Sequence, residues 1–166
     1  MMTNNLERLE KKVVLMLGVP GAGKSTYIRG IPGEVVVASA DHYFIDRQTG
    51  QYLFNGSQLG RAHSECLENF KAAVIRPGAI TVVVDNTNTQ LKALAPYVEF
   101  ANQYGIIPTL VHVVADPKVA AARNVHGVPE ESVMNMHTRL QTLVSILKGS
   151  NHFPSKPEWK YSYVEV

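Results

Sequence analysis

Residues 13–26 of this 166-residue chain read VVLMLGVPGAGKST, and this stretch decides the fold. Its first five residues are apolar and begin with two β-branched valines, which is typical of a strand buried on both faces. Three glycines then interrupt the pattern, and residues 24–29 can begin a helix. A buried strand that passes through a glycine-rich turn into a helix predicts a β-α-β unit, and hence a parallel sheet.

The glycine-rich turn has the residue types and spacing of a phosphate-binding loop. Gly18 and Gly23 are five residues apart and are followed by Lys24 and Ser25. Glycines let main-chain N–H groups approach an anion closely, Lys24 would bridge the β- and γ-phosphates of a nucleoside triphosphate, and Ser25 would ligate Mg²⁺. The alternative is a glycine-rich turn without a ligand. The residues expected to contact the nucleotide are Gly18, Pro20, Gly21, Ala22, Gly23, Lys24, Ser25 and Thr26.

The rest of the chain alternates between short apolar runs and amphipathic stretches. Further strands are predicted at residues 35–38, 80–84 and 106–114. The last residues, 161–166, alternate and are either a fifth strand or an ordered tail. Helices are predicted at residues 57–75 with Ser57 as the cap, from Thr89 to Gly105 with a kink or late start at Pro96, and at residues 117–124 and 130–148. The predicted fold class is α/β, with a parallel sheet of about five strands and helices on both faces.

Two aspartates come directly after predicted strands, at the sheet edge where ligands bind in open α/β folds. Asp41 comes after the second strand and could hold an acceptor hydroxyl and take its proton; the alternative is a turn or capping aspartate. Asp85 comes after the third strand and is the candidate second ligand for Mg²⁺. Thr87 and Asn88 would fix Asp85 or contact the acceptor, although DNTN is also ordinary turn chemistry.

Arg123 begins a candidate lid at residues 123–132, where its charge could neutralise a transferring phosphoryl group; the alternative is a surface arginine near a helix end. Arg139 lies on the last predicted helix and has a less defined role. We expect His63 and Cys66 to be packed on the apolar face of their helix; the alternative for His63 is a contact with the acceptor. An aromatic cluster lies just after Asp41 and would either pack the loop or offer stacking faces to a base; its members are Tyr43, Phe44, Tyr52 and Phe54.

Composition limits the class of protein. Apolar residues are 45% and charged residues 18%, so disorder is excluded, and the single cysteine excludes an intrachain disulfide and a cysteine metal cage. The net charge of +2 neither favours nor excludes nucleic acid. We expect one domain over residues 1–166, with a flexible segment at 1–11, a tail at 150–166, no membrane span and a cytoplasmic location.

The motifs together resemble the polynucleotide 5′-hydroxyl kinase branch of the P-loop kinases, including kinase-like domains of the cyclic-nucleotide phosphodiesterase type. The similarity covers about residues 13–140. The matching segments are GVPGAGKST at 18–26, DHYF at 41–44, LGRAH at 59–63, DNTN at 85–88, PYVE at 96–99 and RNVHGVP at 123–129. One departure is Phe44, because phage-type members have an arginine there that grips the acceptor-side phosphate.

The resemblance implies a P-loop kinase fold, ATP with Mg²⁺, and transfer of the γ-phosphate to a 5′-hydroxyl of RNA or DNA. Any phosphatase or ligase partner would be a separate chain. The implied catalytic residues are Asp41, Lys24 and Arg123, the metal ligands are Ser25 and Asp85, and the acceptor contacts are Asp41, Tyr43, Thr87, Asn88 and Arg139. The alternatives are a kinase of a nucleoside, nucleotide or other small molecule, and an ATP-binding module without catalysis.

Overall fold

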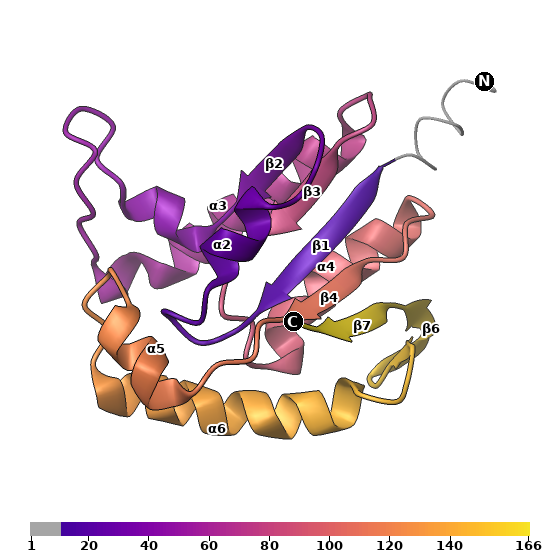
Figure 1. The fold of residues 1–166 in the computed structure, drawn as a ribbon. Helices are drawn as coiled ribbons and strands as arrows, with labels where there is room; N and C mark the ends of the chain where they lie inside the picture. Colours follow the sequence, from indigo (N-terminus) through magenta and orange to yellow (C-terminus); the bar gives the residue numbers. More distant parts are fainter. Residues whose placement is uncertain (1–10) are drawn as a thin grey trace.

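The structure is a computed structural model and describes residues 11–166. A five-stranded parallel sheet forms the centre of the molecule (Figure 1). Its strand order is β2-β3-β1-β4-β7, and every pairing is parallel. Residues 1–10 of the predicted flexible segment lie outside the described residues. The strands are β1 (Lys12–Leu17), β2 (Val35–Ala38), β3 (Thr81–Val84), β4 (Thr109–His112) and β7 (Ser162–Glu165).

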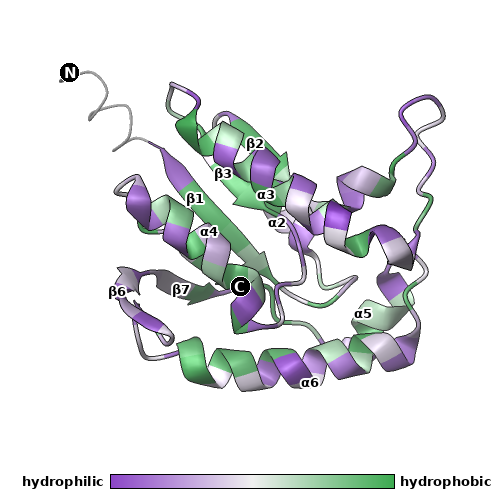
Figure 2. Ribbon diagram, turned by 180° about the vertical axis from the view of Figure 1, so that it is seen from behind, coloured by the Kyte–Doolittle hydropathy of each residue, from purple (hydrophilic) through white to green (hydrophobic). Residues whose placement is uncertain are grey.

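Helices cover both faces of this sheet, as the alternating sequence predicts. Figure 1 shows α2 in front of the sheet, and Figure 2, seen from behind, shows α3 and α4 over the opposite face. No helix within residues 11–166 combines the length and apolar character needed to cross a bilayer. The helices are α2 (Lys24–Arg29), α3 (Leu59–Ile75), α4 (Leu91–Gln103), α5 (Pro117–Arg123) and α6 (Glu130–Leu147), with 3-10 turns η1 (Ala40–Phe44) and η2 (Gly56–Gln58).

The core lies between the sheet and these helices. All four residues of β3 are buried, and β2 and β3 are coloured mainly hydrophobic in Figure 2. A strand covered on both faces needs apolar side chains at every position, which explains the continuous apolar runs in the sequence. Helix α6 contributes Val133, Leu140, Leu143 and Leu147 to the same core, because residues three, four and seven apart lie on one face of a helix.

The end of the chain contains both a confirmed strand and an unpredicted hairpin. Strand β7 pairs with β4 and completes the sheet. The last residues are therefore a fifth strand of the sheet and not an ordered tail. Strands β5 (His152–Phe153) and β6 (Lys156–Lys160) form an antiparallel hairpin that the sequence did not predict. Its residues are mostly exposed and polar, so no alternating pattern marks them. The hairpin is held by Phe153, which is fully buried and packs near Trp159.

Two helix starts differ from the prediction. The helix predicted from Ser57 begins at Leu59, and the preceding turn is capped by Asn55, whose side chain accepts a hydrogen bond from the Ser57 amide at 3.1 Å. Helix α4 begins at Leu91, without a capping bond from Thr89, and includes Pro96. Helix ends depend on local backbone contacts that propensity alone does not resolve.

The glycine-rich turn after β1 packs directly against the last turn of α5. Gly21 has a φ of +81°, and a Cβ built on it would lie 2.0 Å from the carbonyl oxygen of Ala120. The backbone of the turn therefore depends on the absence of a side chain at this position. This contact joins the first β-α unit to a helix that comes much later in the chain.

Replacing Gly21 by alanine should lower the free energy of unfolding in urea by clearly more than replacing Gly78. Both glycines have positive φ, which costs an alanine about 1–2 kcal/mol, but a Cβ at Gly78 meets open space. The excess loss in Gly21→Ala over Gly78→Ala measures the clash with Ala120. Equal losses would contradict the close packing of the turn on α5.

Candidate active site

One cavity of about 890 Å³ opens at the carboxyl ends of β1, β2 and β3. The glycine-rich loop forms part of its wall, and residues from η1, the aromatic segment after it, the end of β3 and the segment after α5 form the rest. The lining residues include Pro20, Gly21, Gly23, Lys24, Ser25, Thr26, Arg29, Asp41, Tyr52, Phe54, Leu59, His63, Asp85, Asn86, Thr87, Arg123, His126, Ser132 and Met136.

The glycine-rich loop is shaped by main-chain hydrogen bonds. The Gly18 amide donates to the Thr87 carbonyl at 3.1 Å, which ties the loop to the end of β3. Gly23 caps α2 with a φ of 107°, in the left-handed region that favours glycine. Gly18 and Ala22 do not line the cavity themselves, whereas the other six predicted nucleotide contacts do. Lys24 folds back over the loop, and its Nζ donates to the carbonyls of Gly18 and Val19 at 2.8 and 3.0 Å.

Lys24, Asp85 and Asp41 form a charge cluster in the wall of the cavity. Burial lowers the pKa of Lys24, and the charges of Asp85 and Asp41 partly oppose this shift. Burial also raises the pKa of Asp85, although the nearby Lys24 charge lowers it in part. Desolvation is therefore the larger influence on both Lys24 and Asp85. A cationic ammonium beside a carboxylate, both facing a cavity, is suited to bind a phosphate chain with its metal ion.

Asp41 is held in position from two sides. Its backbone amide donates to the Ser39 hydroxyl at 3.2 Å, and the Tyr52 hydroxyl donates to its Oδ1 at 3.0 Å. The Nε2 of His126 lies 3.6 Å from its Oδ2. Burial, together with the Asp41 charge, raises the pKa of Tyr52 to about 12, so this hydroxyl stays a donor at neutral pH. The side chain of Asp41 is 48% exposed and lines the cavity.

The DNTN segment divides between the cavity and the protein interior. Asp85 and Thr87 line the cavity, as predicted. The Asn86 side chain accepts a hydrogen bond from the Ala40 amide at 2.9 Å and so links the end of β3 to the turn that carries Asp41. Asn88 is buried and donates to the Met16 carbonyl at 2.7 Å. The predicted acceptor contact at Asn88 is thus a structural bond that fixes the turn.

The segment after α5 covers one side of the cavity. Arg123 lines the cavity and is exposed. Asn124 organises the turn, because its side chain donates to the carbonyls of Ala121 and Val128 and accepts from the Val128 amide at 2.8 Å. His126 lies in the same turn, with its ring 4.1 Å from that of Tyr52. This segment therefore lies beside Asp41 and Tyr52 as well as beside the glycine-rich loop.

Two other predicted acceptor contacts lie outside the cavity. The Tyr43 hydroxyl donates to Gln58 at 3.1 Å, and its ring packs edge-on against Phe44. Arg139 is exposed on α6 and does not line the cavity. The tyrosine that lines the cavity is instead Tyr52, which lies eleven residues from Asp41 in the sequence and donates a hydrogen bond to it.

Sequence reasoning also missed polar residues that line the cavity. Arg29 lies at the end of α2, and His63 is exposed on α3, which corrects the prediction that it is packed. Cys66 is buried as predicted, and burial raises the pKa of its thiol. His63 was misplaced because its spacing fits the apolar face, while the helix turns that position toward the cavity.

The donor atoms fit Mg²⁺ held jointly with phosphate. Within residues 11–166 no group of three or more His, Cys, Asp or Glu side chains could hold a metal by itself. Mg²⁺ is commonly bound by one or two protein oxygens together with substrate phosphates and water. The Ser25 hydroxyl and the Asp85 carboxylate, both in the cavity wall, would supply such oxygens.

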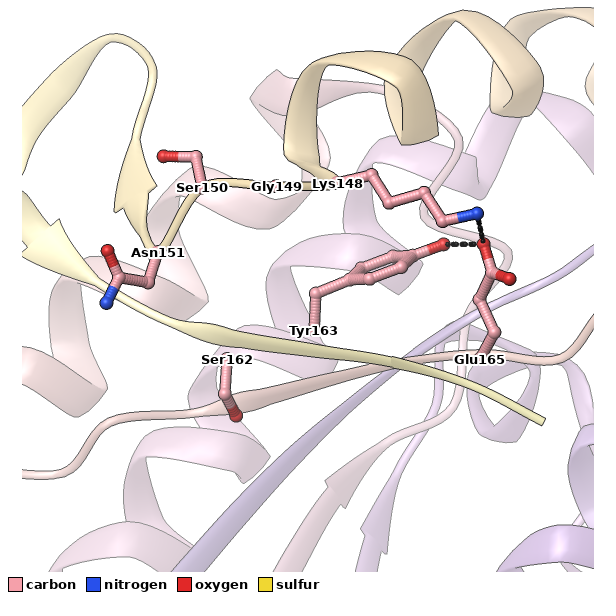
Figure 3. Close-up of a pocket in the computed structure, with 7 residues that line it drawn as sticks. All are labelled: Lys148, Gly149, Ser150, Asn151, Ser162, Tyr163 and Glu165. Carbon is pink, nitrogen blue, oxygen red and sulfur yellow. Dashed lines mark hydrogen bonds and ion pairs between the residues drawn. The ribbon is translucent and has the colours of Figure 1, made fainter.

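A second hollow lies between the end of α6 and β7, and it contains none of the predicted site residues. Figure 3 shows Lys148 and Tyr163 reaching the same carboxylate, that of Glu165, at 2.7 and 2.9 Å. The Nδ1 of His112 on β4 shares a hydrogen bond of 2.9 Å with the Tyr163 hydroxyl. Burial lowers the pKa of this histidine. These contacts fasten the edge strand to the last helix.

Most of the chain matches a known protein family. Residues 13–143 match the family model described as AAA domain. The chain belongs to the AAA domain family. NEDD4-binding protein 2 of Homo sapiens is 31% identical over 157 residues, which cover 88% of this chain and 8% of that protein. The chain therefore spans only a small part of the length of this curated relative.

Solved structures share the fold at low sequence identity. A chain of the Pnkp1/Rnl/Hen1 RNA repair complex has a TM-score of 0.66 at 18% identity, covering 83% of this chain and 46% of that one. A gluconokinase from Sinorhizobium meliloti 1021 has a TM-score of 0.53 at 15% identity, covering 93% of this chain and 82% of that one. These similarities confirm the predicted α/β P-loop kinase-like fold.

Replacing Asp85 by asparagine should raise the melting temperature at pH 7. Because burial raises the pKa of Asp85, the folded protein binds this proton more tightly than the unfolded chain does. Stability therefore decreases as the pH rises from the ordinary aspartate value through the raised pKa, and the neutral amide avoids that loss. Calorimetry at pH 7 and at acidic pH should show the gain at pH 7 and its disappearance in acid.

Asp46 is the matched control for this measurement. Hydrogen bonds from the Thr49 and Gln48 amides lower the pKa of Asp46, so its ionised form is the one that folding favours. Asp46→Asn should therefore give no gain in melting temperature at pH 7. A gain in Asp46→Asn equal to that in Asp85→Asn would contradict burial as the cause.

Proposed function

We propose that this chain transfers the γ-phosphate of ATP to the 5′-hydroxyl of a polynucleotide. The observation that carries the proposal is the convergence of Lys24, Asp41 and Asp85 on a single cavity beside the glycine-rich loop. Phosphoryl transfer needs positioning and charge stabilisation more than strong basicity, and this set of groups is suited to both.

On the donor side, the loop amides and Lys24 would hold the triphosphate. The Nζ of Lys24, which is bonded to two loop carbonyls, would turn to the β- and γ-phosphate oxygens. Arg123 and Arg29 line the same cavity and would stabilise charge on the transferring group. Bound Mg²⁺, held through Ser25 and Asp85, would neutralise phosphate charge.

On the acceptor side, Asp41 would orient the attacking hydroxyl and receive its proton. The hydroxyl oxygen forms a bond to the γ-phosphorus as the bond to the β,γ-bridging oxygen breaks, and ADP leaves. Tyr52 occupies Oδ1 of Asp41 and so leaves Oδ2 for the acceptor. His126, at 3.6 Å from Oδ2, would move aside or share this oxygen when the hydroxyl binds.

A polynucleotide acceptor is supported by the lining of the cavity. The wall that includes Asp41 carries exposed aromatic and imidazole groups, Phe54 and His63, that suit a nucleotide rather than a small polyol. The sequence motifs resemble polynucleotide 5′-hydroxyl kinases, and a chain of an RNA repair complex shares the fold. RNA and DNA ends are both included in the proposal.

A small-molecule acceptor is the second candidate, and one observation favours it. Phe44, at the place where phage-type kinases have a phosphate-gripping arginine, is buried among aromatic rings and offers no charge. A neutral nucleoside would not need that charge. Its phosphorylation would proceed through the same Lys24 and Asp41.

The direct test is transfer of labelled γ-phosphate from ATP with Mg²⁺ to a 5′-hydroxyl oligonucleotide. Lys24→Ala should reduce the rate at least about a hundredfold through loss of phosphate stabilisation. Asp41→Ala should reduce it by about 10²–10⁴-fold while ATP binding, measured by calorimetry, is retained.

Asp46→Ala is the control, since this aspartate is close to Asp41 in the sequence but does not line the cavity. It should transfer phosphate at the wild-type rate. Label on a nucleoside but not on any oligonucleotide would replace the polynucleotide by the second candidate. Near-normal transfer by Asp41→Ala would remove Asp41 as the base.

A further inference from the structure

We infer that Phe54 is a stacking platform for the first nucleobase of the acceptor strand. This inference rests on the proposed function and names the part of the acceptor that the cavity recognises. It predicts that an unpaired base on the 5′-terminal nucleotide favours phosphorylation of the acceptor. The base would be recognised by its flat face, with little preference among the four bases.

Phe54 is largely exposed to solvent, whereas most phenylalanine side chains are buried. The residue is 58% exposed and lines the same cavity as Lys24 and Asp41. Its neighbour Leu53 is 51% exposed but does not line the cavity. An exposed ring in the wall of a polar cavity is a surface for a flat, partly apolar ligand.

The ring of Phe54 is fixed from behind. Phe44 lies with its ring centroid 5.1 Å away, and the Leu53 amide donates to the Phe44 carbonyl at 2.8 Å. The intervening segment is closed by a bridge between Ile45 and Tyr52. A ring that is already fixed loses little conformational entropy when a base stacks on it. Phe44 thus supports a stacking surface where phage-type kinases have an arginine.

The platform is at a suitable place relative to the carboxylate that activates the hydroxyl. Tyr52 bonds Asp41 at 3.0 Å, and its ring is nearly parallel to that of Phe54, with an interplanar angle of 19° and centroids 6.4 Å apart. The Tyr52 ring is itself in contact with His126 at 4.1 Å. Phe54 is therefore the more accessible aromatic group of this pair, and it lies beside the tyrosine that holds Asp41.

The test compares two oligonucleotides that differ only at the 5′-terminal nucleotide, one with a base and one abasic, both with a 5′-hydroxyl. Wild-type protein should phosphorylate the abasic acceptor with kcat/KM about tenfold lower, from the usual contribution of one stacked base. Phe54→Ala should lower kcat/KM for the base-bearing acceptor to the abasic value and leave the abasic value unchanged. Leu53→Ala should behave as wild type.

Phe54→Trp guards against loss of folding, because it keeps an aromatic face and should retain the discrimination. A second readout is the fluorescence of 2-aminopurine at the 5′ end, which should be quenched on binding to wild type and not to Phe54→Ala. Equal phosphorylation of both acceptors by wild type, or unchanged discrimination in Phe54→Ala, would overturn the platform and leave the proposed function intact. No label on either oligonucleotide, with ATP bound, would overturn the proposed function, and absent quenching would then overturn the platform as well.

Discussion

The parallel pairing of β2, β3 and β1 is the constraint on which the site depends. Ala38 pairs with Val84, and Val84 pairs in turn with Leu15 on the other side. The three strands therefore end at one edge, where the glycine-rich loop, the turn with Asp41 and the Asp85 segment come together. Two hydrogen bonds between these segments hold them in place. The Gly18 amide donates to the Thr87 carbonyl, and the Ala40 amide donates to the Asn86 side chain.

The convergence of these segments also buries the charged groups of Lys24 and Asp85, and burial disfavours their charged forms. Desolvation lowers the pKa of Lys24 and raises that of Asp85, so neither ion is fully compensated by the other. In the proposed function, a triphosphate with Mg²⁺ would bring both the negative and the positive charge that these groups lack. Sites that bind charged ligands commonly have perturbed pKa values because partners are left for the ligand to provide. The pKa shifts of Lys24 and Asp85 therefore mark a cost in stability that the proposed binding of a highly charged substrate would explain.

Local signals in the sequence predicted the α/β fold and the position of the glycine-rich loop. Continuous apolar runs identified the strands, and the glycine spacing with Lys24 identified the loop, because both depend on the backbone of a single segment. The hairpin of β5 and β6 was missed because it buries little besides Phe153. The contacts of Asn88 and Tyr43 were not predicted. The Asn88 side chain donates a hydrogen bond to the Met16 carbonyl and the Tyr43 hydroxyl donates one to Gln58, and no local pattern links these segments.

By itself the sequence determined the α/β architecture, the phosphate loop and the two aspartates at strand ends, since strand direction fixes which end of a segment reaches the ligand edge. Only the tertiary structure decided which side chains surround Asp41. Tyr52 and His126 reach it from segments 11 and 85 residues further along the chain. Aromatic residues near Asp41 were equally suited to packing and to stacking. The choice between them depends on burial, and burial is a property of the whole fold: Phe44 became core and Phe54 became surface.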